Sequence, residues 1–174
     1  RDLELRGYLA IILAVSAVIS VDLIWRSGYE FERAIRGATF QVVSIITTTG
    51  FVTEDFELWS PLCHVLLLAL MFVGGCTGST SGGLKVARVM LLGRLVDREF
   101  KRMVEPRGVF AVRFSGVVMT ERSIQSMLNL LYVVLAVYFL ACVLLSAIGL
   151  DLVTSISAVA ATMFNVGPGL GAVG

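Results

Sequence analysis

The sequence contains few charged residues, a single histidine and no pattern of paired cysteines. Charged residues make up 16% of its 174 residues, against about 25% in a typical soluble domain, and 57% are hydrophobic. A soluble fold of this size leaves much of its surface in water and could not cover so much apolar area. The lone His64 and three isolated cysteines exclude a histidine-rich metal site and a disulfide framework. The net charge of +1 argues against a nucleic-acid partner, and the composition as a whole indicates a membrane protein with several spanning segments.

Two apolar runs, residues 8–25 and 127–150, are long enough to cross a membrane as helices. Residues 8–25 would extend over about 27 Å as a helix, close to the thickness of a hydrocarbon core. A third run, residues 62–73, is too short to span and is followed by the glycine-rich segment 74–83 and by further apolar residues up to 96. Irregular backbone at membrane depth is tolerated only where it is buried in protein or lines a watery cavity. The sequence therefore predicts a broken helix beside a pore or a substrate path.

The distribution of basic residues predicts the orientation of the chain. Residues 85–122 contain nine basic and four acidic residues, whereas residues 26–64 contain three basic and five acidic ones. Cytoplasmic loops carry the excess of lysine and arginine, so residues 85–122 are expected on the cytoplasmic side, where they attract anionic lipid. Trp25 and Trp59 are expected as anchors at the membrane surface. Asp22, within the first span, either lies near the outer surface or pairs inside the helix bundle.

The two halves of the sequence share one plan. In each half a spanning run is followed by a short helical segment, residues 31–46 or 151–164, and then by a glycine-containing turn. Gly50 and Gly167 in these turns are 117 positions apart, and the starts of the two spans differ by about the same amount. The pattern predicts two copies of a helix, a pore helix, a turn and a returning helix. We expect one repeat over residues 1–96, a basic connector over residues 97–122 and a partial repeat, without its returning helix, over residues 123–174.

The predicted turns have the chemistry of a cation site. A short helix that ends at membrane depth directs the negative end of its dipole toward the turn. Extended residues after it can point their carbonyl oxygens inward and replace the water shell of a dehydrated ion. Thr47, Thr48 and Thr49 suit such extended backbone, and Gly50 permits the unusual dihedral angles that a cage of carbonyls requires. Selection of potassium over sodium is the best-known use of such a cage.

Three segments of the sequence resemble one known family. Residues 41–51, which include the Thr-Thr-Thr-Gly turn, look like the third pore loop of the TrkH subunit of bacterial potassium uptake systems, and residues 158–170 resemble its fourth pore loop. Residues 74–85 resemble the intramembrane loop of the same family. The resemblance implies an all-α membrane protein, built from four helix–pore helix–filter–helix repeats around one potassium pore. This chain would supply the third repeat and most of the fourth.

The resemblance also implies which residues contact the ion and which form the gate. The filter would consist of Thr47, Thr48, Thr49 and Gly50 in one repeat and of Asn165, Val166 and Gly167 in the other, with the potassium ion held by Thr48, Thr49, Asn165 and Val166. No organic cofactor is implied. Because the second turn departs from Thr-Thr-Thr-Gly, the ring would be only pseudo-fourfold, and we expect weaker discrimination against sodium than in a symmetric potassium channel. The intramembrane loop would act as the gate, through Gly74, Gly75, Gly78, Gly82, Gly83 and Lys85.

The glycine-rich segment allows more than one interpretation. As a gate it would block the path under the filter and move aside on opening, whereas a static helix kink would stay packed by its neighbours. Lys85 either extends to lipid headgroups, as lysines near a membrane surface do, or tethers the loop through an acidic group or loop carbonyls. A phosphate-binding loop is excluded, because Leu84 separates Gly83 from Lys85 and Val86 follows where the motif requires Ser or Thr.

Partners and location follow from the same resemblance. TrkH-like subunits lie in the bacterial inner membrane, form homodimers and dock on a cytosolic ring of nucleotide-binding regulatory subunits similar to TrkA, for which the basic connector is the expected contact. The other pore repeats of the full-length protein and membrane lipid are further expected partners, and nucleic acid is not. From the residues alone, a secondary transporter with broken helices at its substrate site stays open as the alternative. An enzyme is not expected, since His64 stands alone and no acid–base pair lies at membrane depth.

Overall fold

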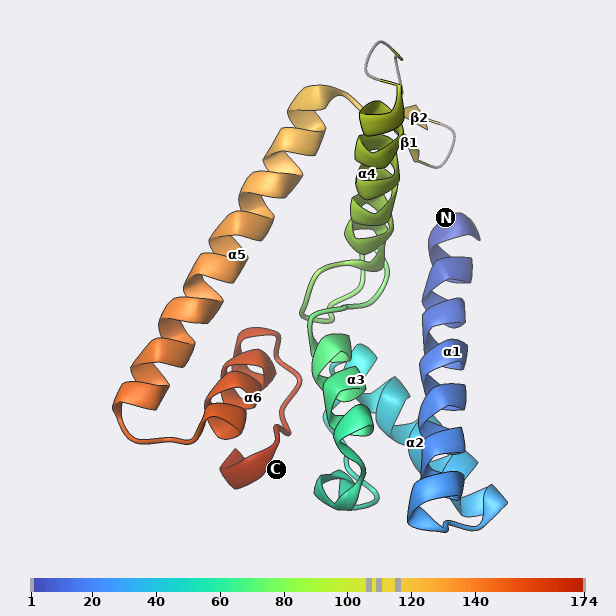
Figure 1. The fold of residues 1–174 in the computed structure, drawn as a ribbon, viewed down its shortest axis with the longest axis vertical. Helices are drawn as coiled ribbons and strands as arrows, with labels where there is room; N and C mark the ends of the chain where they lie inside the picture. Colours follow the sequence, from blue (N-terminus) through green and yellow to red (C-terminus); the bar gives the residue numbers. More distant parts are fainter. Residues whose placement is uncertain (1, 106–107, 109–110, 115–116, 174) are drawn as a thin grey trace.

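The fold is almost entirely helical, as predicted. The computed structural model describes residues 2–105, 108, 111–114 and 117–173 (Figure 1). Its elements in chain order are α1 (Asp2–Ser27), α2 (Phe31–Ile46), a short 3-10 helix (Phe56–Leu58), α3 (Pro61–Met71), α4 (Val86–Val104), β1 (Arg113–Phe114), β2 (Val117–Val118), α5 (Glu121–Ala147), α6 (Leu152–Met163) and a second 3-10 helix (Gly171–Val173). The two strands pair antiparallel over two residues each within the connector.

Two of the described helices, α1 and α5, are long and apolar enough to cross a membrane. Both begin earlier than the hydropathy of the sequence predicts, because their first residues are polar and extend the helix beyond the apolar run. The last turn of α5 ends at Ala147, before the predicted limit at residue 150, and Gly149 then turns the chain with φ +107°. Half of the apolar side chains on α5 are exposed and few are buried, as expected for a helix that faces lipid or other spanning segments.

Helices α2 and α6 are the two short helices that the repeat predicts. Each packs against the spanning helix that precedes it, α2 on α1 and α6 on α5, and both lie at the same end of the molecule, opposite the connector (Figure 1). With 16 and 12 residues, they extend over about 24 and 18 Å, too little to cross a membrane. Asp151 caps α6, as its position predicts, by accepting a hydrogen bond of 3.1 Å from the backbone N–H of Thr154.

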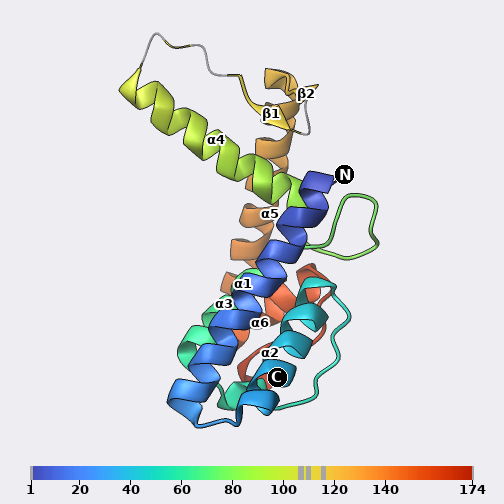
Figure 2. The ribbon, with the colours of Figure 1, turned by 90° about the vertical axis from the view of Figure 1, so that its right-hand side faces the viewer.

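The predicted break between residues 74 and 83 is a loop whose two ends are joined by backbone hydrogen bonds, which we call its stem. The stem forms where Gly74 N–H donates to Leu84 O and Leu84 N–H donates to Phe72 O, both over 2.8 Å. Beyond the loop, α4 crosses α1 near the N-terminus of the chain (Figure 2). Since α4 continues to Val104, the first part of the 97–122 connector is helical.

The main core lies where α1, α2, α3 and α6 meet. Its members include Ile19 and Leu23 of α1, Ile45 of α2 and Met71 of α3, all fully buried. Trp59 belongs to this core with 4% of its surface exposed, so the prediction that it anchors the chain at the membrane surface is wrong. The packing of this core buries the ring, which hydropathy cannot reveal. Trp25 is 86% exposed, as an anchor requires.

Candidate functional site

The two glycine turns, far apart in the sequence, lie backbone against backbone. A methyl group placed on Gly167 would lie 3.7 Å from Cα of Gly50, and one placed on Gly50 would overlap the carbonyl oxygen of Val166. Pro168 lies close to the same position, with its Cδ 3.3 Å from a methyl group on Gly50. The C-terminal ends of α2 and α6 therefore converge on one place, and only glycine at position 50 permits this approach.

The backbone of the two turns is hydrogen-bonded in the same way. Thr49 N–H donates to Ser44 O over 2.9 Å, and Val166 N–H donates to Ala161 O over 2.8 Å. These donors, like these acceptors, are 117 positions apart in the sequence. Because backbone bonds do not depend on side chains, the two turns keep one conformation although only one of them reads Thr-Thr-Thr-Gly.

Left-handed residues occupy matching positions in the two turns. Thr48 and Asn165 have φ values of +56° and +53°, and Gly50 and Gly167 follow two positions later with +75° and +106°. The prediction of extended backbone is therefore wrong for Thr48, and also for Thr47, which has the right-handed helical φ of −82° as the C-cap of α2. Thr48 and Asn165 are the described non-glycine residues with positive φ, a conformation that costs free energy and concentrates at functional sites. Such strain persists only where surrounding hydrogen bonds and packing hold the backbone in place.

The side chains that support the turns differ between the repeats. In the first turn, the Thr47 hydroxyl hydrogen-bonds to Val43 O over 2.6 Å and to the Thr49 hydroxyl over 2.7 Å. In the second, the Ser157 hydroxyl donates to Leu170 O over 2.8 Å and accepts from Leu170 N–H over 2.9 Å. Ser157 lies about two helical turns earlier in its repeat than Thr47 does in the first, a difference that the repeat in the sequence does not reveal.

The loop over residues 74–83 contacts the first turn and the end of α6 through Gly82. Gly82 N–H donates to the Thr48 hydroxyl over 3.2 Å, and a methyl group on Gly82 would overlap the carbonyl oxygen of Phe164 at the end of α6. Phe164 directly precedes the second turn. Gly82 therefore contacts the Thr48 side chain within the first turn and the backbone directly before the second.

Lys85 holds the loop rather than extending to the membrane surface. Its Nζ donates to Ser79 O over 2.9 Å and to Ser81 O over 2.6 Å. Of the two roles that the sequence left open for Lys85, the structure therefore supports the tether through loop carbonyls. A second charged residue, Glu4 at the start of α1, accepts hydrogen bonds from the backbone N–H and hydroxyl of Thr77 over 2.5 and 2.9 Å. Nothing in the sequence indicates that Glu4 meets the loop.

Asp22 pairs inside the helix bundle, one of the two positions that the sequence allowed. Its carboxylate accepts a hydrogen bond from the Ser60 hydroxyl and lies 3.3 Å from Arg26 Nε, while its side chain is 7% exposed. His64, also on α3, hydrogen-bonds through Nε2 to Phe56 O over 3.0 Å. The bond of Asp22 joins α1 to the N-cap of α3, and the bond of His64 joins α3 to the 3-10 helix before it. Both residues therefore have a structural role.

Among the residues that the structure describes, no group of three or more His, Cys, Asp or Glu side chains could hold a metal ion. The oxygens gathered at the turns are instead backbone carbonyls and threonine hydroxyls. In general, uncharged oxygens suit a large monovalent cation better than a small divalent one, which favours carboxylates.

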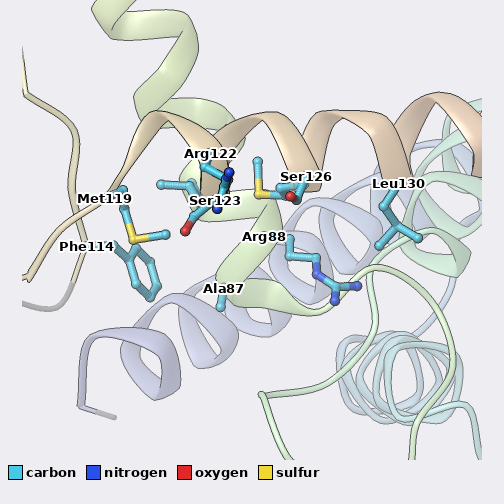
Figure 3. A pocket seen from close by; sticks show the side chains of 10 residues that line it. Ala87, Arg88, Phe114, Met119, Arg122, Ser123, Ser126 and Leu130 are labelled. Carbon is cyan, nitrogen blue, oxygen red and sulfur yellow. The ribbon is translucent and has the colours of Figure 1, made fainter.

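A cleft of about 560 Å³ lies between α4 and α5, away from the two turns (Figure 3). Arg88 of α4 and Arg122 of α5 line it together with Ser123, Ser126 and apolar side chains such as Leu130. The cleft contains none of the residues predicted for the filter or the gate. Its mixture of arginines, hydroxyls and apolar groups resembles the boundary between lipid and water rather than an ion path.

Fold and site together define a helical membrane protein in which two short helices bring paired, strained backbone turns to one place. The chain belongs to the TrkH family, whose model, described as "Cation transport protein", matches residues 13–173. This membership confirms the resemblance found in the sequence and the predicted location in a membrane.

Characterised relatives match nearly the whole chain. The Trk system potassium uptake protein TrkH of Vibrio parahaemolyticus is 40% identical over 99% of this chain, and TrkH of Salmonella typhimurium and TrkG of Escherichia coli are each 35% identical over 99%. The crystal structure of the potassium transporter TrkH from Vibrio parahaemolyticus superimposes with a TM-score of 0.91 at 38% identity, covering 98% of this chain and 36% of that one. The chain spans 36% of the length of each of these relatives.

Proposed function

We propose that this chain forms part of a potassium-conducting pore in the inner membrane, contributing a third pore repeat and most of a fourth. The observation that carries this proposal is the contact between the two turns, in which Gly50 and Gly167 meet although 117 positions separate them. The relatives are potassium uptake proteins by name, and the cation transport family includes this chain. A potassium ion is then the transported substrate, and no catalytic step is needed.

The proposed filter is the backbone of residues 47–50 and 165–167. Left-handed residues that alternate with ordinary ones, as at Thr48 and Gly50, direct successive carbonyl oxygens to one side of the chain. Such oxygens replace the water shell of potassium at little cost, whereas sodium, which holds its water more tightly, is compensated less well. Thr47, Thr48, Thr49, Asn165 and Val166 would offer these carbonyls. Since the two turns differ in sequence and support, we expect discrimination against sodium to be weaker than in a symmetric channel, and equal exclusion in flux assays would contradict this.

Other pore repeats are needed to close the proposed ring. An apolar hollow of about 580 Å³ beside α2 supports this, because it exposes Phe40, Val43, Thr49 and Phe51 next to the proposed filter. In a full-length protein this face would be covered by a neighbouring repeat. A homodimer, and a cytosolic nucleotide-binding subunit at the connector, complete the proposed assembly.

The proposed gate is the loop over residues 74–83 with Lys85. Its contacts through Gly82 support this role, since a loop that contacts the first turn and the end of α6 is placed to obstruct the path beneath the turns. Gly74, Gly75, Gly78 and Gly83 would give it room and freedom to move. Opening would then require the bond from Gly82 to Thr48 to break.

Selectivity measurements on the full-length protein in proteoliposomes test the proposed filter. Gly50→Ala forces the backbone away from Val166, so we expect the preference for potassium over sodium to fall at least tenfold. Gly28→Ala is the matched control, since Gly28 has a similar φ of +66° but no atom near an added methyl group. Retention of full selectivity by Gly50→Ala would overturn the filter. Saturable, ion-coupled uptake without single-channel currents would instead favour the secondary transporter.

A further inference from the structure

The intramembrane loop is attached to the rest of the molecule at two points. Among the described residues, its hydrogen bonds to elements beyond α3, α4 and its own stem are those of Gly82 with Thr48 and of Thr77 with Glu4. The first attachment leads to the proposed filter. The second leads to the N-terminal turn of α1, at the end of the molecule where the connector lies (Figure 1).

The attachment to Glu4 is made by a buried charge. Glu4 is 9% exposed, and a carboxylate removed from water is costly unless hydrogen bonds replace the lost hydration. Thr77 supplies two such bonds, over 2.5 Å from its backbone N–H and 2.9 Å from its hydroxyl. Hydrogen bonds to an ionised group are about twice as strong as those between neutral groups. A carboxylate near a helix N-terminus is also favoured by the helix dipole, but that effect does not require a contact with residue 77.

The loop keeps its own shape through bonds that do not involve Glu4. Gly75 N–H donates to the Ser81 hydroxyl over 2.7 Å, Ser79 N–H donates to Cys76 O over 3.0 Å, and Lys85 binds two loop carbonyls. The loop can therefore move as a unit when an external attachment is released. Thr77 is the attachment that lies away from the turns.

Helix α4 is placed to act on this attachment. Gly7, one turn after Glu4 on α1, packs so tightly on α4 that an added methyl group would lie 2.5 Å from Met90 Sδ. A displacement of α4 would therefore shift the N-terminal turn of α1, which carries the Glu4 bonded to Thr77. Since α4 leads directly into the basic connector, this contact joins the connector to the loop.

We propose that Glu4 is a positioning residue, a latch that keeps the loop closed by holding Thr77, and that its release is a step in opening. The inference rests on the proposed gate function of the loop. Displacement of α4 loosens the end of α1, the two hydrogen bonds to Thr77 break, and the loop then swings on its stem away from the turns.

Single-channel recording from the full-length protein tests the latch. Glu4→Ala removes both hydrogen bonds of the attachment and Thr77→Val removes the one from the hydroxyl. Each should lower the ratio of closed to open time about tenfold, equivalent to about 1.4 kcal/mol. The double variant should add little to the larger single effect, because both changes break the same contact. Thr77→Ser keeps both donors and should behave like the unmodified protein. Arg6→Gln, an exposed change on the same helix, is the matched control and should have no effect.

Chemical accessibility provides a second measurement. Cys76, next to Thr77, is partly buried and should react with a charged methanethiosulfonate reagent about tenfold faster in the Glu4→Ala or Thr77→Val protein. The Cys76→Ser variant lacks this thiol and therefore shows how much of the labelling comes from Cys76. Should Glu4→Ala fail to fold, Thr77→Val carries the test on its own.

Unchanged gating and unchanged Cys76 reactivity in the Thr77→Val protein would overturn the latch. That result is distinguishable from failure of the pore proposal, which is tested by ion selectivity in the Gly50→Ala protein. Neither Glu4 nor Thr77 contributes to the proposed filter, so their variants should retain the ordinary preference for potassium. A loss of that preference in the Thr77→Val protein would also contradict a latch that acts on the loop alone.

Discussion

At the scale of single residues, the site depends on backbone conformations that few residue types adopt. Gly50 and Gly167 could be predicted, since glycine after a short helix commonly marks a turn with positive φ. The left-handed conformations of Thr48 and Asn165 could not, because threonine in particular disfavours them. They follow from hydrogen bonds and contacts made by the whole turn, such as that between the Thr48 hydroxyl and Gly82.

Asp151 offers a test of local structure with a defined pH dependence. Hydrogen bonds from the side chain and the backbone N–H of Thr154 lower the pKa of this carboxyl below its ordinary value of 3.8. The folded state therefore prefers the ionised form, so this stabilisation is present at neutral pH and is lost as the pH falls through the lowered pKa. Asp151→Ala should reduce the thermal midpoint of the full-length protein by about 2 °C at pH 7.

The same measurement at low pH separates the cap from other effects of the substitution. Below the ordinary carboxyl pKa the difference between Asp151→Ala and the unmodified protein should shrink. Asp151→Asn serves as the control, since asparagine also caps helices but does not titrate. A midpoint difference that stays constant with pH would show that the ionised cap does not stabilise α6.

At the scale of elements, hydropathy located the broken helix correctly but did not predict the conformation or the contacts of its loop. The short apolar run and the glycines around it predicted that α3 and α4 would be separate helices. The closed stem joins Phe72 and Gly74 to Leu84. The attachments of the loop depend on Glu4 of α1 and on Thr48 after α2, which reach the loop only in the folded chain. The choice between a moving gate and a static kink therefore needs a functional measurement.

Gly82→Ala provides that measurement. The added methyl group would overlap Phe164 O, so the loop should be displaced from the turns and the open probability in single-channel recordings should change at least tenfold. Gly93→Ala in the exposed middle of α4 is the control, because no atom lies within contact distance of its added methyl group. If the two variants conduct alike, the segment is a static kink.

At the scale of the whole molecule, the described fold exposes apolar surface that is expected to contact lipid or further protein. Phe51 is 69% exposed beside the proposed filter, and Phe40 and Val43 of α2 lie next to it in the same hollow. Contiguous apolar surface of this kind marks contact with lipid or with further protein. Its place next to the paired turns favours protein, since a carbonyl site must be shielded from lipid.

A charge on this face should interfere with assembly. Phe51→Glu in the full-length protein would bury a carboxylate against a neighbouring repeat, and we expect the yield of monodisperse protein in size-exclusion chromatography to fall severalfold. Leu58→Glu is the matched control, because Leu58 is 76% exposed in the 3-10 helix at the end of the molecule opposite the connector. Equal behaviour of the two variants would mean that no repeat covers Phe51.

Local properties of the chain were sufficient to predict the two helices of spanning length, the short helices and the broken helix, because hydropathy, helix caps and glycine turns act over a few neighbouring residues. They also located the two turns that we propose as the filter, since matching turns recur 117 positions apart. The meeting of Gly50 with Gly167, the burial of Trp59 and the attachment of Thr77 to Glu4 follow no local rule. They join residues distant in sequence, and such contacts arise from the packing of α1, α2, α3 and α6 around one core.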